Sequence, residues 1–127
     1  MIAYDKEVDP PAPYLSVTVA SPIEKRRRET LPALLDTGSD VTAIPARLVE
    51  PLQLYPIGRL RLEDVKSETT FVYTYGVRLN VAEAIIPRAE VILTGLDFIV
   101  LGRDVLNRFY LTLNGPDLLF DLNLSPK

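Results

Sequence analysis

Apolar and polar residues alternate along several short segments of this chain, with the two-residue period that is typical of β-strands. In residues 14–20, Leu15, Val17 and Val19 would share one face, and the residues between them are polar. Residues 29–35 follow a short charged stretch and are the expected hairpin partner. This pattern predicts an antiparallel pair of strands near the start of the domain.

The rest of the chain continues the pattern and predicts an all-β fold with one short helix near the C-terminus. Further strands are expected at residues 41–44, 59–62, 69–81, 91–94, 98–101, 110–114 and 118–122. We expect a bend or bulge at Gly76, inside the longest strand, and a turn at residues 87–90. One helical turn is expected within residues 45–54, and residues 102–109 predict the short helix.

The length of the chain suits a single domain. Its 127 residues can enclose one hydrophobic core and leave no room for two. Residues 1–13 are charged and proline-bearing, which predicts an extended N-terminal arm rather than a helix. We therefore expect one domain at residues 14–124, followed by a tail at residues 125–127.

The composition excludes several kinds of chemistry. The chain is 47% apolar and 24% charged, which is ordinary for a globular protein. It contains no cysteine and no histidine, which removes disulfides, thiol catalysis, histidine-dependent nucleophiles and the usual zinc sites. We therefore expect no metal and no cofactor. Any catalysis must use carboxylates, hydroxyls, lysine or tyrosine.

Charge and hydropathy limit the expected partners and location. A net charge of −3 gives no basic footprint, so we expect no nucleic-acid partner. The N-terminus lacks the features of a secretory signal, and no run approaches the roughly 20 apolar residues of a membrane span. These observations predict a cytoplasmic protein without a membrane partner.

Residues 24–29 form a charge run, Glu-Lys-Arg-Arg-Arg-Glu, between the first two predicted strands. The simplest interpretation is a solvated hairpin tip. A functional basic patch and a processing site for another protease are the alternatives.

The stretch at residues 34–45 reads Leu-Leu-Asp-Thr-Gly-Ser-Asp-Val-Thr-Ala-Ile-Pro and is the strongest candidate for a functional site. Asp36 directly follows two leucines, so its carboxylate should lie on a tight loop at the rim of the core, where it needs hydrogen bonds. Gly38 lets the backbone turn closely, and Thr37 and Ser39 carry hydroxyls. The simpler alternative is a turn in which Asp36 only caps its own backbone.

A second segment, Phe-Ile-Val-Leu-Gly-Arg-Asp-Val-Leu at residues 98–106, strengthens the functional interpretation. Together with the Asp-Thr-Gly-Ser loop it resembles the retropepsins, the single-domain aspartic proteases of retroviruses and their cellular relatives. The two motifs lie in the order and at the spacing of that family. The resemblance implies a closed β-barrel with the acid-protease fold and a flap hairpin.

The resemblance assigns a role to each residue of the loop. Asp36 would be the catalytic aspartate. Thr37 would bond to its counterpart in a partner subunit, and Gly38, next to Ser39 in the active-site loop, would present backbone to the carboxylate and to substrate. Asp40 would form an ion pair with Arg103 that braces the loop.

The resemblance also implies that the ribbon at residues 62–71 is a flap that folds over bound peptide. Its tip would consist of Glu63, Asp64, Val65, Lys66 and Ser67. The viral flap tip is rich in glycine, whereas this one contains none.

The activity implied is that of an aspartic endopeptidase acting on peptide or protein substrates. Water would be activated between two aspartates, one from each subunit of a homodimer, because a single chain supplies one Asp-Thr-Gly. In the family the terminal strands usually interleave at the dimer interface, so residues 1–13 and 122–127 are the candidates here. The alternatives are a non-catalytic dimerisation or peptide-binding module with this fold, and an unrelated β-barrel binding protein.

Overall fold

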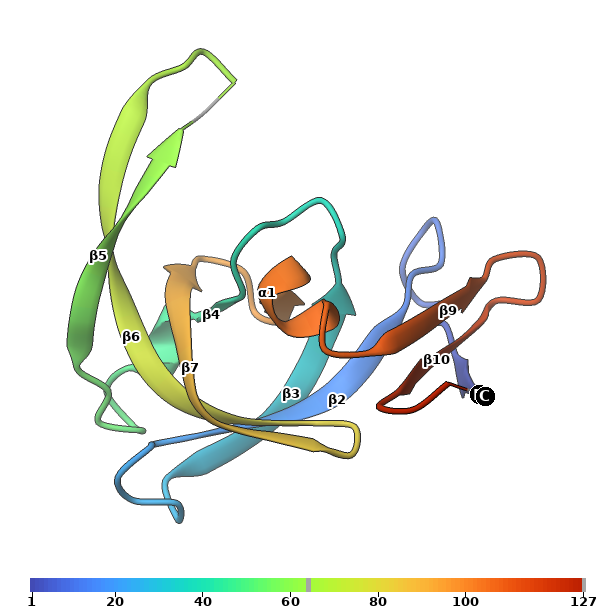
Figure 1. The fold of residues 1–127 in the computed structure, drawn as a ribbon, viewed down its shortest axis with the longest axis horizontal. Coiled ribbons are helices and arrows are strands. Elements are labelled where there is room, and N and C mark those ends of the chain that lie inside the picture. The colour runs from blue at the N-terminus through green and yellow to red at the C-terminus, as the bar shows by residue number, and fades with distance from the viewer. Residues whose placement is uncertain (64, 127) are drawn as a thin grey trace.

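The computed structural model describes residues 1–63 and 65–126 and consists mostly of strands, as the alternating pattern predicts (Figure 1). The strands are β1 (Ile2–Ala3), β2 (Tyr14–Ala20), β3 (Arg28–Leu35), β4 (Ala43–Pro45), β5 (Pro56–Glu63), β6 (Thr69–Val81), β7 (Ala84–Thr94), β8 (Ile99–Leu101), β9 (Tyr110–Asn114) and β10 (Leu119–Asn123). The helices are the 3-10 turn η1 (Ala46–Leu48) and the short α1 (Arg103–Leu106). No helix in the described ranges has the length and apolar character to cross a bilayer.

Six strands close into a barrel. Their order is β2-β3-β8-β4-β7-β6, and β6 pairs back onto β2 to complete the ring. Alternate side chains of these strands point inward and form one core, whose fully buried members include Val17, Ile44, Leu79, Ile99 and Leu101. The predicted all-β barrel is thus confirmed.

One pairing positions the candidate site. The strands β3 and β8 run parallel, with Leu34 opposite Val100 and Leu35 opposite Leu101. Because parallel strands end at the same edge of a sheet, the segments that follow them emerge together. This pairing brings the Asp-Thr-Gly loop beside the Gly-Arg-Asp segment, although the two are far apart in sequence.

The hairpin of β5 and β6 extends beyond the barrel and stands clear of the body (Figure 1). Along it, Leu60 and Val72 lie opposite each other and are half-buried, whereas Arg61 and Phe71 lie opposite each other and are exposed. The hairpin therefore has an inner apolar face and an outer face in solvent, as the period of a strand requires.

The chain termini form a second sheet in the order β1-β10-β9. Within it, Ile2 lies opposite Phe120 and Ala3 opposite Leu119 of the same chain, and the ring of Tyr4 packs at 5.9 Å from that of Phe120. The arm predicted to be extended therefore contributes a strand to its own subunit. The boundaries of the domain, residues 14–124, stay a prediction.

Two local predictions are wrong. The expected turn at residues 87–90 does not occur, because β7 runs through it and the chain turns instead at Ala82 (φ 51°). The irregularity expected at Gly76 lies further along β6, where its pairing with β7 shifts register between Val77 and Leu79. That shift leaves Pro87 in a bulge, where a residue without an N–H is tolerated in a sheet.

Candidate active site

The backbone of Asp36 is fixed at the point where β3 leaves the barrel. Its N–H donates to the carbonyl of Leu101 at 3.0 Å, and the N–H of Leu35 donates to the carbonyl of Pro13 at 3.1 Å. The residue is half-buried. The sequence pattern predicted this position at the rim of the core, and the hydrogen bonds to two different segments hold it there.

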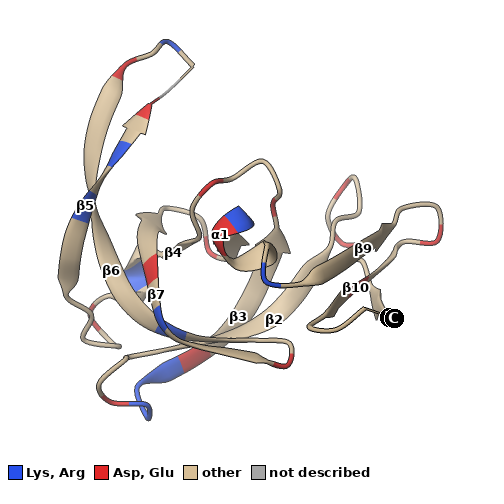
Figure 2. Cartoon of the chain, viewed as in Figure 1, with Lys and Arg blue, Asp and Glu red and all other residues tan. Residues whose placement is uncertain are grey.

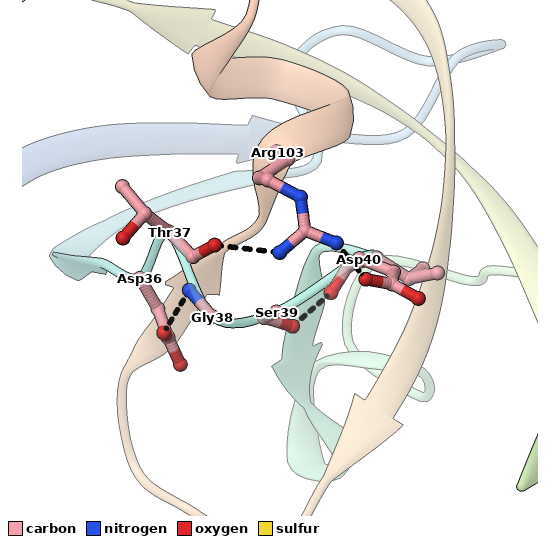
Figure 3. A network of polar contacts seen from close by, with 7 residues as sticks. Asp36, Thr37, Gly38, Ser39, Asp40 and Arg103 are labelled. Carbon is pink, nitrogen blue, oxygen red and sulfur yellow. Dashed lines mark hydrogen bonds and ion pairs between the residues drawn. The ribbon is translucent and has the colours of Figure 1, made fainter.

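The carboxylate of Asp36 is oriented by its own loop (Figure 3). Oδ1 accepts a hydrogen bond from the N–H of Gly38 at 2.9 Å, and the carbonyl of Asp36 accepts from the N–H of Ser39 at 3.2 Å. A Cβ on residue 38 would lie 3.2 Å from Oδ1, so glycine leaves this hydrogen bond unobstructed. The simple capping turn considered from the sequence is present. It uses Oδ1, and Asp36 Oδ2 makes no hydrogen bond with the described residues.

Arg103 braces the far side of the loop (Figure 3). Its guanidinium donates to the carbonyl of Thr37 at 2.6 Å and forms an ion pair with Asp40. Its backbone N–H donates to the carbonyl of Ser39 at 2.8 Å. The structure therefore brings together Asp40 and Arg103, the pair expected from the resemblance. Since both side chains are substantially exposed, the contacts fix the shape of the loop more than they stabilise the fold.

The remaining loop side chains have separate surroundings. The Ser39 hydroxyl donates to the carbonyl of Val41 at 2.9 Å, which fastens the second half of the loop. Thr37 is exposed, and its carbonyl, rather than its hydroxyl, makes the contact with Arg103. The hydroxyl of Thr37 is thus available to a partner outside the chain.

A polar cluster around the buried hydroxyl of Thr42 was not anticipated from the sequence. The carboxylate of Asp104 accepts from the N–H of Thr42 at 3.1 Å and from its hydroxyl at 2.7 Å. The hydroxyl of Thr42 in turn accepts from the N–H of Gly102 at 3.1 Å. The available signal was Thr42, a polar residue inside an otherwise apolar strand pattern.

Gly102 allows the loop and α1 to pack in direct contact. A Cβ at this position would lie 2.8 Å from the carbonyl carbon of Val41 and 3.0 Å from the carbonyl oxygen of Ser39. Backbone atoms cannot move aside as a flexible side chain can, so only glycine fits this close approach. Its φ of −86° is ordinary, which makes the requirement one of space.

The flap residues predicted from the sequence lie at the end of the β5–β6 hairpin. Glu63 ends β5, and Val65, Lys66 and Ser67 belong to the connection, where Ser67 has a φ of 63°. Asp64 lies outside the described residues. The described residues of this connection stand away from the Asp-Thr-Gly loop (Figure 1).

A cavity of about 330 Å³ lies between the base of the flap and the loop. Leu60 lines it from the flap and Val41 from the loop. Asp104 lines it from α1, and Arg108 from the segment that follows this helix. Within the described ranges, no group of three or more acidic side chains is arranged to hold a metal ion.

Comparisons with known proteins give the fold its name. No protein-family model matches the sequence, and no curated protein matches it. Among solved structures, a retropepsin-like aspartic protease from Rickettsia conorii aligns with 96% of this chain and 88% of its own, at a TM-score of 0.59 and 14% identity.

Two further structures give the same result. EIAV protease complexed with the inhibitor HBY-793 aligns with 84% of this chain and 92% of its own, at a TM-score of 0.56 and 19% identity. The retroviral protease-like domain of Ddi1 from Leishmania major aligns with 91% of this chain and 94% of its own, at a TM-score of 0.53 and 17% identity. Likeness at these identities establishes the architecture: the chain has the retropepsin-like fold.

Proposed function

We propose that this chain is an aspartic endopeptidase that acts as a homodimer on peptide or protein substrates. The observation that carries the proposal is the Asp36 carboxylate, held by the N–H of Gly38 on a loop that Arg103 braces. A chain without histidine or cysteine has few other means of hydrolysing a peptide bond. A cytoplasmic location belongs to the same proposal.

The chemistry requires two such carboxylates. One activates a water molecule for attack on the peptide carbonyl, and the other, in its acid form, protonates the departing amide nitrogen. Two carboxylates about 3 Å apart cannot both be ionised, so they share one proton and supply the base and the acid together. Each chain carries one Asp-Thr-Gly, so the pair must form on a two-fold axis between identical subunits.

The terminal sheet suggests how the subunits would meet. β10 is paired on both sides within its own chain, by β1 and β9, so interleaving of the N-terminal strand would first require the β1–β10 pairing to open. β9 has a neighbour on one side only and leaves backbone groups free at its other edge. Leu113 on this strand is 50% exposed although it is apolar. We propose that β9 pairs with β9 of the partner across the two-fold axis.

The decisive experiment is cleavage of an unstructured protein from about pH 3 to about pH 8, the range over which a carboxylate pair gains and loses its shared proton. Wild type would be compared with Asp36→Asn, which removes charge but little volume, with and without pepstatin. The control is Glu83→Gln, which changes an exposed acid in the β6–β7 turn. We expect acid-favoured cleavage by wild type and the control, and none by Asp36→Asn.

The non-catalytic alternative has one feature in its favour, the glycine-free flap tip. A flap that cannot close over substrate would leave a dimeric peptide-binding module. Folded, dimeric wild type without any cleavage across the pH range would favour that alternative. Cleavage that persists in Asp36→Asn would refute the catalytic assignment.

A further inference from the structure

The β2–β3 hairpin concentrates positive charge on an acidic protein. Lys25, Arg26, Arg27 and Arg28 are consecutive and exposed, although the chain carries a net charge of −3. None of the four forms an ion pair with another described residue. Two acids flank them in sequence. Glu29 is bound to Arg47 at 2.6 Å, and Glu24 accepts a hydrogen bond from the backbone N–H of Arg26 at 3.4 Å.

The backbone of the hairpin tip has a defined shape. The buried hydroxyl of Ser21 accepts hydrogen bonds from the N–H groups of Ile23 at 3.2 Å and Glu24 at 3.1 Å. The N–H of Ser21 donates to the carbonyl of Arg27 at 2.9 Å, and the N–H of Arg27 donates to the carbonyl of Glu24. These bonds fix where the cations project before any partner binds, which lowers the entropy cost of binding.

An apolar groove lies directly beside the basic tip. It has a volume of about 330 Å³ and is lined by Pro22, Ile23, Ile57, Gly76, Arg88 and Glu90, among others. Ile23 is 82% exposed and Ile57 is 61% exposed, so two large aliphatic side chains stand in solvent at its walls. Exposed apolar surface of this kind, rimmed by charge, is typical of an interaction site.

This surface is separate from the catalytic loop. Figure 2 places the basic hairpin at the opposite end of the barrel from α1 and from the loop that α1 braces. The terminal sheet with the open edge of β9 also lies elsewhere (Figure 1). A partner on the hairpin surface would therefore leave the loop and the proposed dimer interface free. It would approach the cavity beside the loop only through Arg88, Ala89 and Glu90, which line both hollows.

We propose that the hairpin tip and the groove bind an acidic peptide segment of a partner protein, with one apolar side chain seated between Ile23 and Ile57. The four cations supply charge complementarity to the acids that would follow that anchor. The groove is concave, and a hollow of this volume suits a side chain, whereas a flat bilayer would contact only its rim. Glu90 in the wall is bonded to the hydroxyl of Thr74, which holds its carboxylate toward the sheet.

The test uses a fluorescein-labelled peptide, Gly-Leu-Glu-Glu-Asp-Glu-Gly, and fluorescence anisotropy with the Asp36→Asn protein. This variant cannot cleave the probe by the proposed mechanism, so failure here is distinct from failure of the proposed function. Arg26→Glu/Arg28→Glu should weaken binding by at least about tenfold at low salt, and Ile23→Ser by about fivefold. The matched control is Lys6→Glu, compared with Arg26→Glu alone, since each replaces one exposed cation with an acid.

We expect the Asp36→Asn protein and the control to bind the peptide. Binding should weaken in Arg26→Glu/Arg28→Glu and in Ile23→Ser, and also when serine replaces leucine in the peptide. No binding by the parent, or equal loss in the control, would overturn the proposal. Equal affinity for the leucine-free peptide or for a single-stranded oligonucleotide would indicate general attraction of polyanions and would also overturn it. So would Ile23-dependent sedimentation with phosphatidylserine vesicles in the absence of peptide binding.

Discussion

The carboxylate of Asp104 binds both the N–H and the hydroxyl of Thr42, at 3.1 and 2.7 Å. These residues come from α1 and from the segment leading into β4, so the contact ties the helix to the strand that follows the Asp-Thr-Gly loop. Thr42 is completely buried. Because the buried hydroxyl of Thr42 needs this partner, the contact favours one arrangement of α1 and β4 over others that would leave it unpaired.

Thr42→Val should destabilise the protein by about 1 to 3 kcal/mol, since it leaves the buried N–H of Gly102 without its acceptor. The free energy of unfolding from urea denaturation measures the loss. Thr30→Val is the control, because its hydroxyl meets only that of Thr18 in an exposed pair. Its cost should stay within about 0.5 kcal/mol. Equal costs for the two variants would contradict a structural role for the Thr42–Asp104 contact.

Gly102→Ala should lower the free energy of unfolding at least as much as Thr42→Val, because a methyl group does not fit at this position. The added methyl would lie 2.8 Å from the backbone of Val41, and separating the loop from α1 should cost about 1 to 3 kcal/mol. The displaced loop carries Asp36, so cleavage activity should fall as well.

Gly95→Ala provides the matched control for this substitution. A Cβ there meets nothing within 4 Å, and no glycine among the described residues has a positive φ. Its unfolding free energy should be unchanged or slightly raised, because alanine restricts the unfolded chain. Similar losses in both variants would contradict the close approach to Val41 as the cause, because position 95 has no such neighbour.

The fold was largely predictable because short-range patterns determine most of it. The alternation in residues 14–20 and 29–35 predicted β2 and β3 within one residue. The prediction of a turn at residues 87–90 was wrong because proline usually interrupts a strand. Here a shift in the pairing of β6 and β7 accommodates Pro87 within β7. Such a shift depends on the partner strand, and no local pattern in β7 reports it.

The candidate site was predictable where a motif carried it. The loop containing Asp36 and its contact with Arg103 followed from the resemblance. Thr42 and Gly102 were missed, because their importance comes from which backbone atoms lie beside them, and that proximity is created by the parallel pairing of β3 and β8. A single sequence does not contain this information in readable form.

Arg103→Ala should reduce cleavage much more than stability. The guanidinium holds the carbonyl of Thr37 at 2.6 Å and the carboxylate of Asp40, so its loss frees the loop that carries Asp36. The side chains of Arg103 and Asp40 are 44% and 80% exposed, and exposed ion pairs contribute only about 0 to 1 kcal/mol. We expect a small change in unfolding free energy beside a large fall in kcat/KM.

A double-mutant cycle with Asp40→Asn separates the two contacts of Arg103. If the ion pair alone braces the loop, adding Arg103→Ala to Asp40→Asn should cause no further loss of kcat/KM. The bond to the carbonyl of Thr37 is independent of Asp40, so we expect a further loss. Arg103→Lys should restore little, because one ammonium cannot reproduce the two directed bonds of the fork. Full activity in Arg103→Ala would contradict the bracing role.

Leu113→Glu should weaken the proposed dimer by about tenfold or more, because it brings two like charges to the open edge of β9. The dissociation constant is measured by sedimentation equilibrium. Activity should be lost at low protein concentration and recover as concentration rises, since each active site needs two chains. Ile85→Glu, at a position in β7 that is 55% exposed, is the control and should leave the dissociation constant unchanged.

Removal of residues 1–3 distinguishes this interface from interleaved terminal strands. In this structure β1 pairs with β10 of its own chain, so its removal should lower the unfolding free energy of the subunit without weakening the contact at β9. If the N-terminal strand instead crossed to the partner, the same truncation would raise the dissociation constant. A dimer that dissociates on truncation but tolerates Leu113→Glu would refute the pairing of β9 with β9.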